Sequence, residues 1–175
     1  MRLFDIGILE GNHWNPMHLV IHERTGEWLT HVVVLKNEQG DIWDATVGGI
    51  LNHNLSDYPG RKITILRYRQ QGFTIDTDKL LAWMATTQAE CEGYDYSALI
   101  GFLTGLRIQD EKRWFCSELG YWLFQENGYP LTRKDRIFVY PADLYYYDRF
   151  DLVEEFIIPG EPEQPPQEPQ IAGLP

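Results

Sequence analysis

Apolar residues run together or alternate with polar ones in several segments of the first part of the chain, and each such segment predicts a β-strand. Residues 28–35 (Trp-Leu-Thr-His-Val-Val-Val-Leu) are β-branched and apolar on both faces, which is typical of a central strand. The turn at residues 37–40 (Asn-Glu-Gln-Gly) predicts that residues 41–45 return as its antiparallel neighbour. Residues 62–68 predict a further strand, and the alternation in residues 17–22 predicts another.

In the second half of the chain the apolar period lengthens to that of a helix. A helix is predicted over residues 77–93, with its first residue, a threonine, as the N-cap. A short helix is predicted over residues 97–104, and a third over residues 116–127 with Gly128 as its stop signal. Residues 136–140 predict the last strand. The pattern therefore predicts an α+β fold with helices packed against an antiparallel sheet of about five strands.

The chain divides into two regions of different composition. Its length of 175 residues predicts one folded domain, residues 1–158, followed by an extended tail, residues 159–175. The tail is rich in Pro, Glu and Gln and has no basic residue, so it buries too little apolar surface to offset the entropy of ordering it. A protein partner that binds and orders the tail is one candidate role for this segment.

The charge balance narrows the possible partners. The chain has 15 basic and 26 acidic residues and a net charge of −11, which disfavours nucleic acid and anionic membrane surfaces. Its two cysteines make no disulfide framework; as free thiols they fit a reducing compartment, and a single bridge between them is the alternative. The N-terminus lacks a signal-peptide pattern, and no segment approaches the ~18 apolar residues of a membrane span. We expect a cytoplasmic protein without a membrane span, or a virion-associated one if the chain is phage-encoded.

Cys116 is the candidate nucleophile, because it lies at the start of a predicted helix. The positive end of the helix dipole stabilises a thiolate there, and the free N–H groups of the first turn can hold a developing oxyanion. The alternative is a buried structural cysteine, the commonest role of this residue type. Cys91 lies near a predicted helix C-terminus between Glu90 and Glu92, so we expect it to be structural.

His31 is the candidate base. It lies in the middle of an apolar strand, where a histidine is either a hydrogen-bonded core residue or a placed base. Asp44, flanked by apolar residues on the predicted partner strand, is expected to lie beside it, whereas Asp41 is nearer the turn and is expected to be solvated. A carboxylate that accepts from one imidazole nitrogen fixes the tautomer and leaves the other nitrogen for the sulfur.

The other histidines are weaker candidates. His18 and His22 have the spacing of a helical metal-binding pair, but on the predicted strand they lie ~13 Å apart, too far to share one ion. His13 and Trp14 are predicted on a loop at the cleft, and His53 in a polar turn. The sequence predicts no metal site and no cofactor.

Five short motifs follow one another along the chain: Thr30-His31; Asp44-Ala45 followed by Gly48-Gly49-Ile50; Gly93-Tyr94-Asp95-Tyr96; Phe115-Cys116-Ser117-Glu118-Leu119; and Pro141-Ala142-Asp143-Leu144. In this order they resemble the circularly permuted NlpC-type, papain-like cysteine hydrolases, especially the YiiX-like branch, which is related to lecithin retinol acyltransferase. The resemblance covers roughly residues 28–150, and it implies a permuted papain-like arrangement of the α+β fold.

The resemblance also implies roles for single residues. Cys116 matches the nucleophile, His31 the base and Asp44 the orienting residue, although the family more often has Glu or another His in the third position. The substrate-binding residues that we predict are Tyr94 and Ser117, which lie in the motifs, and Trp14 on its loop.

The implied activity is hydrolysis of an amide bond through an acyl-enzyme on the cysteine, as in a thiol protease, with cell-wall (peptidoglycan) peptides as the expected substrate. A thioesterase or acyltransferase acting on lipid or acyl substrates is the alternative within the same fold. The third possibility is a non-catalytic structural module, for example of a phage virion, that keeps the fold and docks through its tail.

Overall fold

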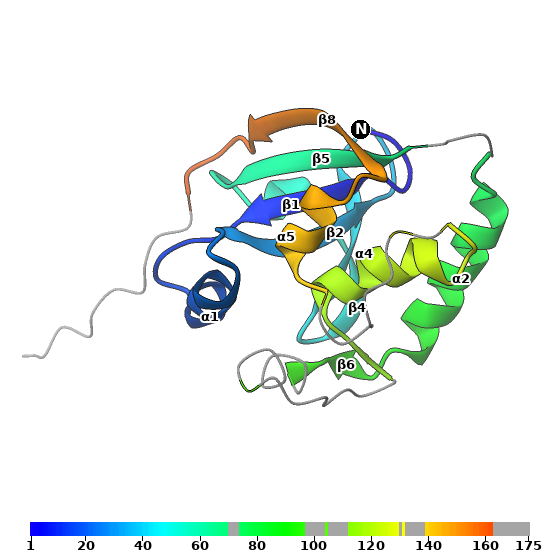
Figure 1. The fold of residues 1–175 in the computed structure, drawn as a ribbon, viewed down its shortest axis with the longest axis horizontal. Helices are drawn as coiled ribbons and strands as arrows, with labels where there is room; N and C mark the ends of the chain where they lie inside the picture. Colours follow the sequence, from blue (N-terminus) through cyan, green and yellow to red (C-terminus); the bar gives the residue numbers. More distant parts are fainter. Residues whose placement is uncertain (70–73, 97–103, 105–111, 130, 132–138, 163–175) are drawn as a thin grey trace, which may run out of the picture.

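A six-stranded antiparallel sheet forms the centre of the molecule (Figure 1). In this computed structural model, the described residues are 1–69, 74–96, 104, 112–129, 131 and 139–162. The strand order is β4-β3-β2-β1-β5-β8, and every neighbouring pair is antiparallel. The strands are β1 (Ile6–Glu10), β2 (Leu29–Leu35), β3 (Asp41–Thr46), β4 (Gly49–Asn54), β5 (Lys62–Tyr68) and β8 (Phe150–Ile157).

Helices and short elements complete the α+β fold. The helices are α1 (Pro16–Thr25), α2 (Thr77–Glu90), α4 (Cys116–Gln125) and α5 (Pro141–Tyr146). A 3-10 turn, η1 (Leu55–Asp57), precedes β5, and β6 (Gly93–Tyr94) pairs in parallel with β7 (Arg113–Trp114). Among the described helices none is long and apolar enough to cross a bilayer.

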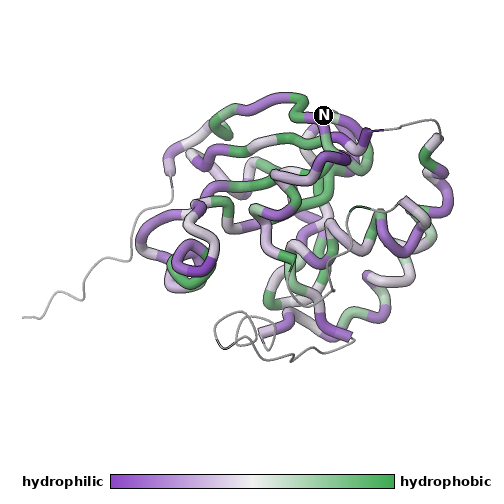
Figure 2. Tube along the Cα trace, viewed as in Figure 1, coloured by the Kyte–Doolittle hydropathy of each residue, from purple (hydrophilic) through white to green (hydrophobic). Residues whose placement is uncertain are grey.

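Strand β2 lies inside the sheet and is buried on both faces. Val32 and Val34 belong to the larger apolar core, which includes the buried residues of α4. Val33 and Leu35 belong to a smaller core with residues of β1, β3 and β5. Because side chains alternate along a strand, the continuous apolar run of this segment covers both faces at once. Figure 2 shows the apolar character of these inner strands.

Helix α4 lies directly against β2, and a glycine allows this close approach. A Cβ atom at Gly120 would lie 3.0 Å from Val32 Cγ1 and 3.3 Å from Leu144 Cδ1 of α5, both closer than ordinary van der Waals contact. The neighbouring residues Leu119, Leu123 and Phe124 are fully buried. This packing fixes the first residue of α4, Cys116, beside the sheet.

The prediction of a strand over residues 17–22 is wrong, because this segment is helix α1. The side chain of Asn15 caps the helix by accepting a hydrogen bond from the Met17 N–H at 3.0 Å, and Pro16 occupies the first turn. Gly26 ends the helix in the left-handed region, at φ 73°, and its N–H donates to the His22 carbonyl. These start and stop signals outweigh the weak alternation between them.

The strands predicted over residues 28–35, 41–45 and 62–68 are confirmed as β2, β3 and β5. The helix predicted from Thr77 is α2, but its N-cap is Asp76, whose Oδ1 accepts from the Lys79 N–H. The sheet has six strands, whereas about five were predicted. Strands β1, β4 and β8 were not predicted. The predicted helix over 97–104 and strand over 136–140 lie almost wholly outside the described residues, as does the predicted tail.

Candidate active site

Asp44 is the centre of a buried polar cluster. It is 0 % exposed and accepts hydrogen bonds from three side chains. His31 Nε2 donates to Oδ1 at 2.8 Å, His53 Nδ1 donates to Oδ2 at 3.0 Å, and the Tyr58 hydroxyl also donates to Oδ2. Burial alone would raise the pKa of Asp44, but the charge of His31 and these hydrogen bonds lower it to about 2. Asp44 is therefore an ionised acceptor at neutral pH.

Strand register brings these groups together. Asp44 pairs with Val33 of β2, two residues from His31, and the β3–β4 hairpin places His53 diagonally across from Asp44. Tyr58 follows η1, which the Asn54 and Asp57 caps hold in place. The cluster thus comes from β2, β3, β4 and the connection into β5.

His31 connects this cluster to the cysteine. Burial lowers the pKa of His31, but the Asp44 charge and interactions with Cys116, including a side-chain hydrogen bond, raise it to about 10. His31 is therefore an imidazolium at neutral pH. Its Nε2 atom is held by Asp44, so Nδ1 is the ring nitrogen that is left for the sulfur.

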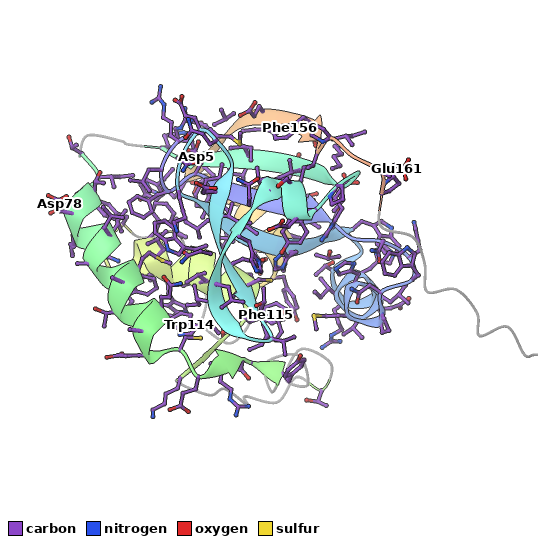
Figure 3. All side chains as sticks on the ribbon, turned by 180° about the vertical axis from the view of Figure 1, so that it is seen from behind. Asp5, Asp78, Trp114, Phe115, Phe156 and Glu161 are labelled. Carbon is purple, nitrogen blue, oxygen red and sulfur yellow. The ribbon has the colours of Figure 1, made fainter. Side chains whose placement is uncertain are left out.

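Cys116 is the first residue of α4 and is 1 % exposed. The residue before it, Phe115 (labelled in Figure 3), donates its N–H to Glu118 Oε2 at 3.0 Å, so the glutamate of the Cys-Ser-Glu-Leu motif caps the helix. The cysteine interacts electrostatically with the His31 imidazole and the Tyr94 hydroxyl. Cys116 belongs to the larger apolar core, and His31 and Tyr94 are the polar groups that interact with it.

Tyr94 lies on the other side of the sulfur. Tyr94 lies on β6. Its hydroxyl donates a hydrogen bond to Met17 Sδ at 3.6 Å and interacts electrostatically with Cys116. Burial, followed by the nearby cysteine, raises the pKa of Tyr94 well above its ordinary value. The hydroxyl keeps its proton at neutral pH and can act as a hydrogen-bond donor beside the sulfur.

A cavity of about 430 Å³ opens against this cluster. His31 and Tyr94, which both interact with Cys116, belong to its wall, whereas Cys116 itself does not line the cavity. The other lining residues come from the α1 region, the β3–β4 turn and the connection from η1 to β5: Asn15, Met17, His18, Ala45, Thr46, Val47, Asp57, Tyr58, Pro59 and Arg61. This volume is within the range of small-molecule sites.

The structure brings together Cys116, His31, Asp44 and Tyr94 and leaves two predicted substrate-binding residues apart. Ser117 is fully buried and donates its hydroxyl to the Val139 carbonyl at 2.6 Å, so it does not line the cavity. Trp14 is half-buried and is also absent from the wall.

Helix α1 changes the expectation for the remaining histidines. His18 and His22 lie one turn apart on this helix, not ~13 Å apart on a strand. His18 Nδ1 accepts from the Asn12 N–H at 3.0 Å, whereas His22 stacks on Trp28 with ring centroids 4.1 Å apart. In the part of the chain that the structure describes, no group of three or more His, Cys, Asp or Glu side chains could hold a metal ion.

Sequence reasoning missed His53 and Tyr58 as partners of Asp44. The prediction placed His53 in a polar turn, but it lies on strand β4. The signal that could have found it is the Val47-Gly48 turn, because counting outward from this turn pairs residue 42 with residue 53.

A scan against models of known protein families gives no match for this chain, and a search among curated proteins gives none either. The site is therefore defined by its own geometry. A cysteine at a helix start, an imidazole and a buried carboxylate form a connected row beside a cavity.

Proposed function

We propose that the protein is a cysteine hydrolase of the circularly permuted NlpC-type, papain-like kind, with Cys116, His31 and Asp44 as its catalytic triad. The observation that carries this proposal is the placement of three groups: Cys116 interacts electrostatically with His31, and His31 Nε2 donates to Asp44 Oδ1 at 2.8 Å. A nucleophile next to a base, with the base oriented by a third group, is the arrangement that nucleophilic catalysis requires. The order His, Asp, Cys along the chain also fits the permuted arrangement.

The geometry supports a two-step reaction on an amide. The Cys116 sulfur attacks the carbonyl carbon and forms a C–S bond, and His31 gives its proton to the leaving nitrogen as the C–N bond breaks. Water then attacks the acyl-enzyme while His31 takes a proton from it, and the C–S bond breaks to release the acid. Asp44 keeps the imidazole oriented and stabilises its charge in both steps.

Two groups beside the sulfur can stabilise the oxyanion. The backbone N–H groups of the first turn of α4 have no partner within the helix, and they lie at its positive end. The Tyr94 hydroxyl contacts the sulfur and stays protonated. We assign both as oxyanion donors.

Peptidoglycan peptides are the substrate class that we propose. The acidic chain suits a soluble peptide better than an anionic lipid surface. The cavity is large enough for a short peptide segment next to the scissile bond.

Cys116→Ala and His31→Ala test the proposal. Each should lower the release of peptide fragments from a muropeptide digest by about four orders of magnitude, because members of a triad act as one unit. The matched control is Cys91→Ala, which removes the other free thiol. Thermal unfolding checks that each variant is folded. Wild-type rates in both folded variants would rule out the triad.

The apolar part of the cavity wall favours a second candidate. Met17, Ala45 and Val47 line the cavity and offer contacts to an acyl chain. A thioesterase or acyltransferase would use the same acyl-enzyme. A fluorescent fatty-acyl ester assayed beside the muropeptide digest separates the two candidates. A thioesterase or acyltransferase should turn over the ester faster than the muropeptides, and a peptidoglycan hydrolase should do the reverse.

A further inference from the structure

His18 brings an unused hydrogen-bond donor to the cavity wall. It lies in the first turns of α1 and is only 8 % exposed. Its Nδ1 accepts from the Asn12 N–H, and burial together with the charges of Arg61 and His31 lowers its pKa to about 4. Because Nδ1 lies closer to the Asn12 N–H, at 3.0 Å, than to Asn12 Oδ1, at 3.3 Å, we assign the proton of the neutral ring to Nε2. No side chain or backbone group of the described residues accepts a hydrogen bond from Nε2.

An N–H donor that faces a cavity is satisfied there by a ligand or by water. His18 is a cavity-lining residue, which makes the interior of the cavity the place for that partner. The partner must be an acceptor, because a neutral imidazole whose Nδ1 already accepts has only its N–H to offer.

Arg61 places a fixed positive charge in the same wall. Its Nε donates to the Glu10 carbonyl at 2.8 Å, and its guanidinium lies 5.4 Å from the centre of the Tyr58 ring. These two contacts orient the side chain, and Arg61 is one of the residues that line the cavity. Asp57 also lines the cavity, but it is an exposed residue whose Oδ2 accepts from the Asn54 N–H in the cap of η1.

We propose that Arg61 and His18 form a subsite for a carboxylate of the substrate. The planar fork of a guanidinium matches the two oxygens of a carboxylate, and the His18 N–H supplies one further donor. The inference rests on the proposed hydrolase function and deepens it. The substrate is an amide that carries a free carboxylate close to the bond attacked by Cys116, since one cavity of about 430 Å³ holds both His31 and the subsite.

Alkylation of Cys116 tests the subsite without a known substrate. Iodoacetate and iodoacetamide both react by forming a C–S bond as the C–I bond breaks and iodide leaves, and they differ mainly in the carboxylate. The rates are measured on the whole protein by peptide mass spectrometry, which reports Cys116 and Cys91 separately. The quantity compared is the iodoacetate rate divided by the iodoacetamide rate at Cys116.

Arg61→Gln should lower this ratio about tenfold, the size expected for the loss of one charge-assisted hydrogen bond. Arg61→Lys keeps the charge and should retain most of the ratio. The matched control is Lys62→Gln, which removes the same charge one residue away. Lys62 pairs with Glu10 and Glu155 outside this cavity, so its removal should change the ratio by less than about twofold.

His18→Asn and His18→Gln form a second matched pair. The amide oxygen of Asn can replace Nδ1 as the acceptor for Asn12, but Asn has no group at the position of Nε2. We expect a roughly threefold lower ratio for His18→Asn. His18→Gln places an N–H donor near that position and should retain the ratio better.

The outcomes separate the subsite from the hydrolase proposal. In one outcome Cys116 reacts with both reagents, and the rate ratio is the same in wild type and in folded Arg61→Gln and His18→Asn. That result would overturn the subsite and leave the triad proposal standing. A Cys116 that reacts with neither reagent in folded wild-type protein would overturn the proposed function, and the subsite with it. If Arg61→Gln does not fold, the comparison of His18→Asn with His18→Gln decides.

Discussion

At the scale of single residues, Asp44 explains how a charged histidine is tolerated in the sheet. A buried carboxylate needs several donors to remain ionised, and Asp44 has three of them in His31, His53 and Tyr58. The cluster is therefore a network in which each partner depends on the others. Its members differ in exposure, since the His53 side chain is 34 % exposed and Asp44 is enclosed.

Tyr58→Phe should weaken this network more than a change at His53. The variant removes the hydroxyl that donates to Asp44 and leaves one oxygen of a buried carboxylate with fewer donors. We expect a loss of about 1.5–3 kcal/mol in the free energy of unfolding, measured with urea. His53→Ala removes a more exposed donor to the same oxygen and should cost about 1 kcal/mol. Equal losses in the two variants would contradict the importance of burial in this cluster.

The sequence carries clearer signals for the three residues of the proposed triad than for their surroundings. Cys116, His31 and Asp44 each have a local signal: a helix start, an apolar strand and the facing strand. The contributions of His53 and Tyr58 depend on the register of the β3–β4 hairpin and on the path of η1. Such relations belong to the tertiary structure, because residues far from a turn are paired by the whole sheet.

At the scale of elements, the contact of α4 with β2 sets the distance between Cys116 and His31. Cys116 begins the helix and His31 lies on the strand, so any shift of α4 moves the two groups apart. Gly120 is the point of closest approach. The geometry of the site therefore depends on a residue that takes no part in the chemistry.

Gly120→Ala should separate helix and strand. The new methyl group meets Val32 Cγ1 at 3.0 Å, so overpacking of about 1–3 kcal/mol should exceed the gain of about 1 kcal/mol from helix propensity. We expect lower stability by urea unfolding and slower alkylation of Cys116. Adding Val32→Ala makes room for the methyl group and should restore the alkylation rate in part. If Gly120→Ala leaves both measurements at wild-type values, the contact between α4 and β2 has room for a methyl group and does not set the position of Cys116.

Element prediction succeeded where one signal dominated. The β2 segment is apolar on both faces and has no competing pattern, so its assignment was confirmed. In α1 the alternation of residues 17–22 competed with the Asn15-Pro16 start and the Gly26 stop, and these capping signals decided the structure. Strands β1, β4 and β8 are short or polar, and pairing with their neighbours stabilises them more than their own sequence does.

At the scale of the whole molecule, His31 and Asp44 give opposite pH dependences of stability. The folded pKa of Asp44 is about 2, below the ordinary value of 3.8, so its contribution is present above pH 3.8 and is lost as the pH falls toward 2. The folded pKa of His31 is about 10, above the ordinary value of 6.5. Its contribution is complete below pH 6.5 and is lost as the pH rises toward 10. The two windows overlap between about pH 4 and 6.5.

The free energy of unfolding should therefore fall as the pH rises from 6.5 to 10. The folded state keeps the His31 proton that the unfolded chain releases, and one pKa unit corresponds to about 1.4 kcal/mol, so a decline of a few kcal/mol is expected. Urea unfolding at a series of pH values measures it. His31→Gln lacks the titrating group and should flatten this decline, whereas Lys62→Gln, an exposed cation outside the cluster, should keep it. A wild-type curve as flat as that of His31→Gln would mean that His31 is not held as an imidazolium, and the ion pair with Asp44 would then be absent from the folded protein.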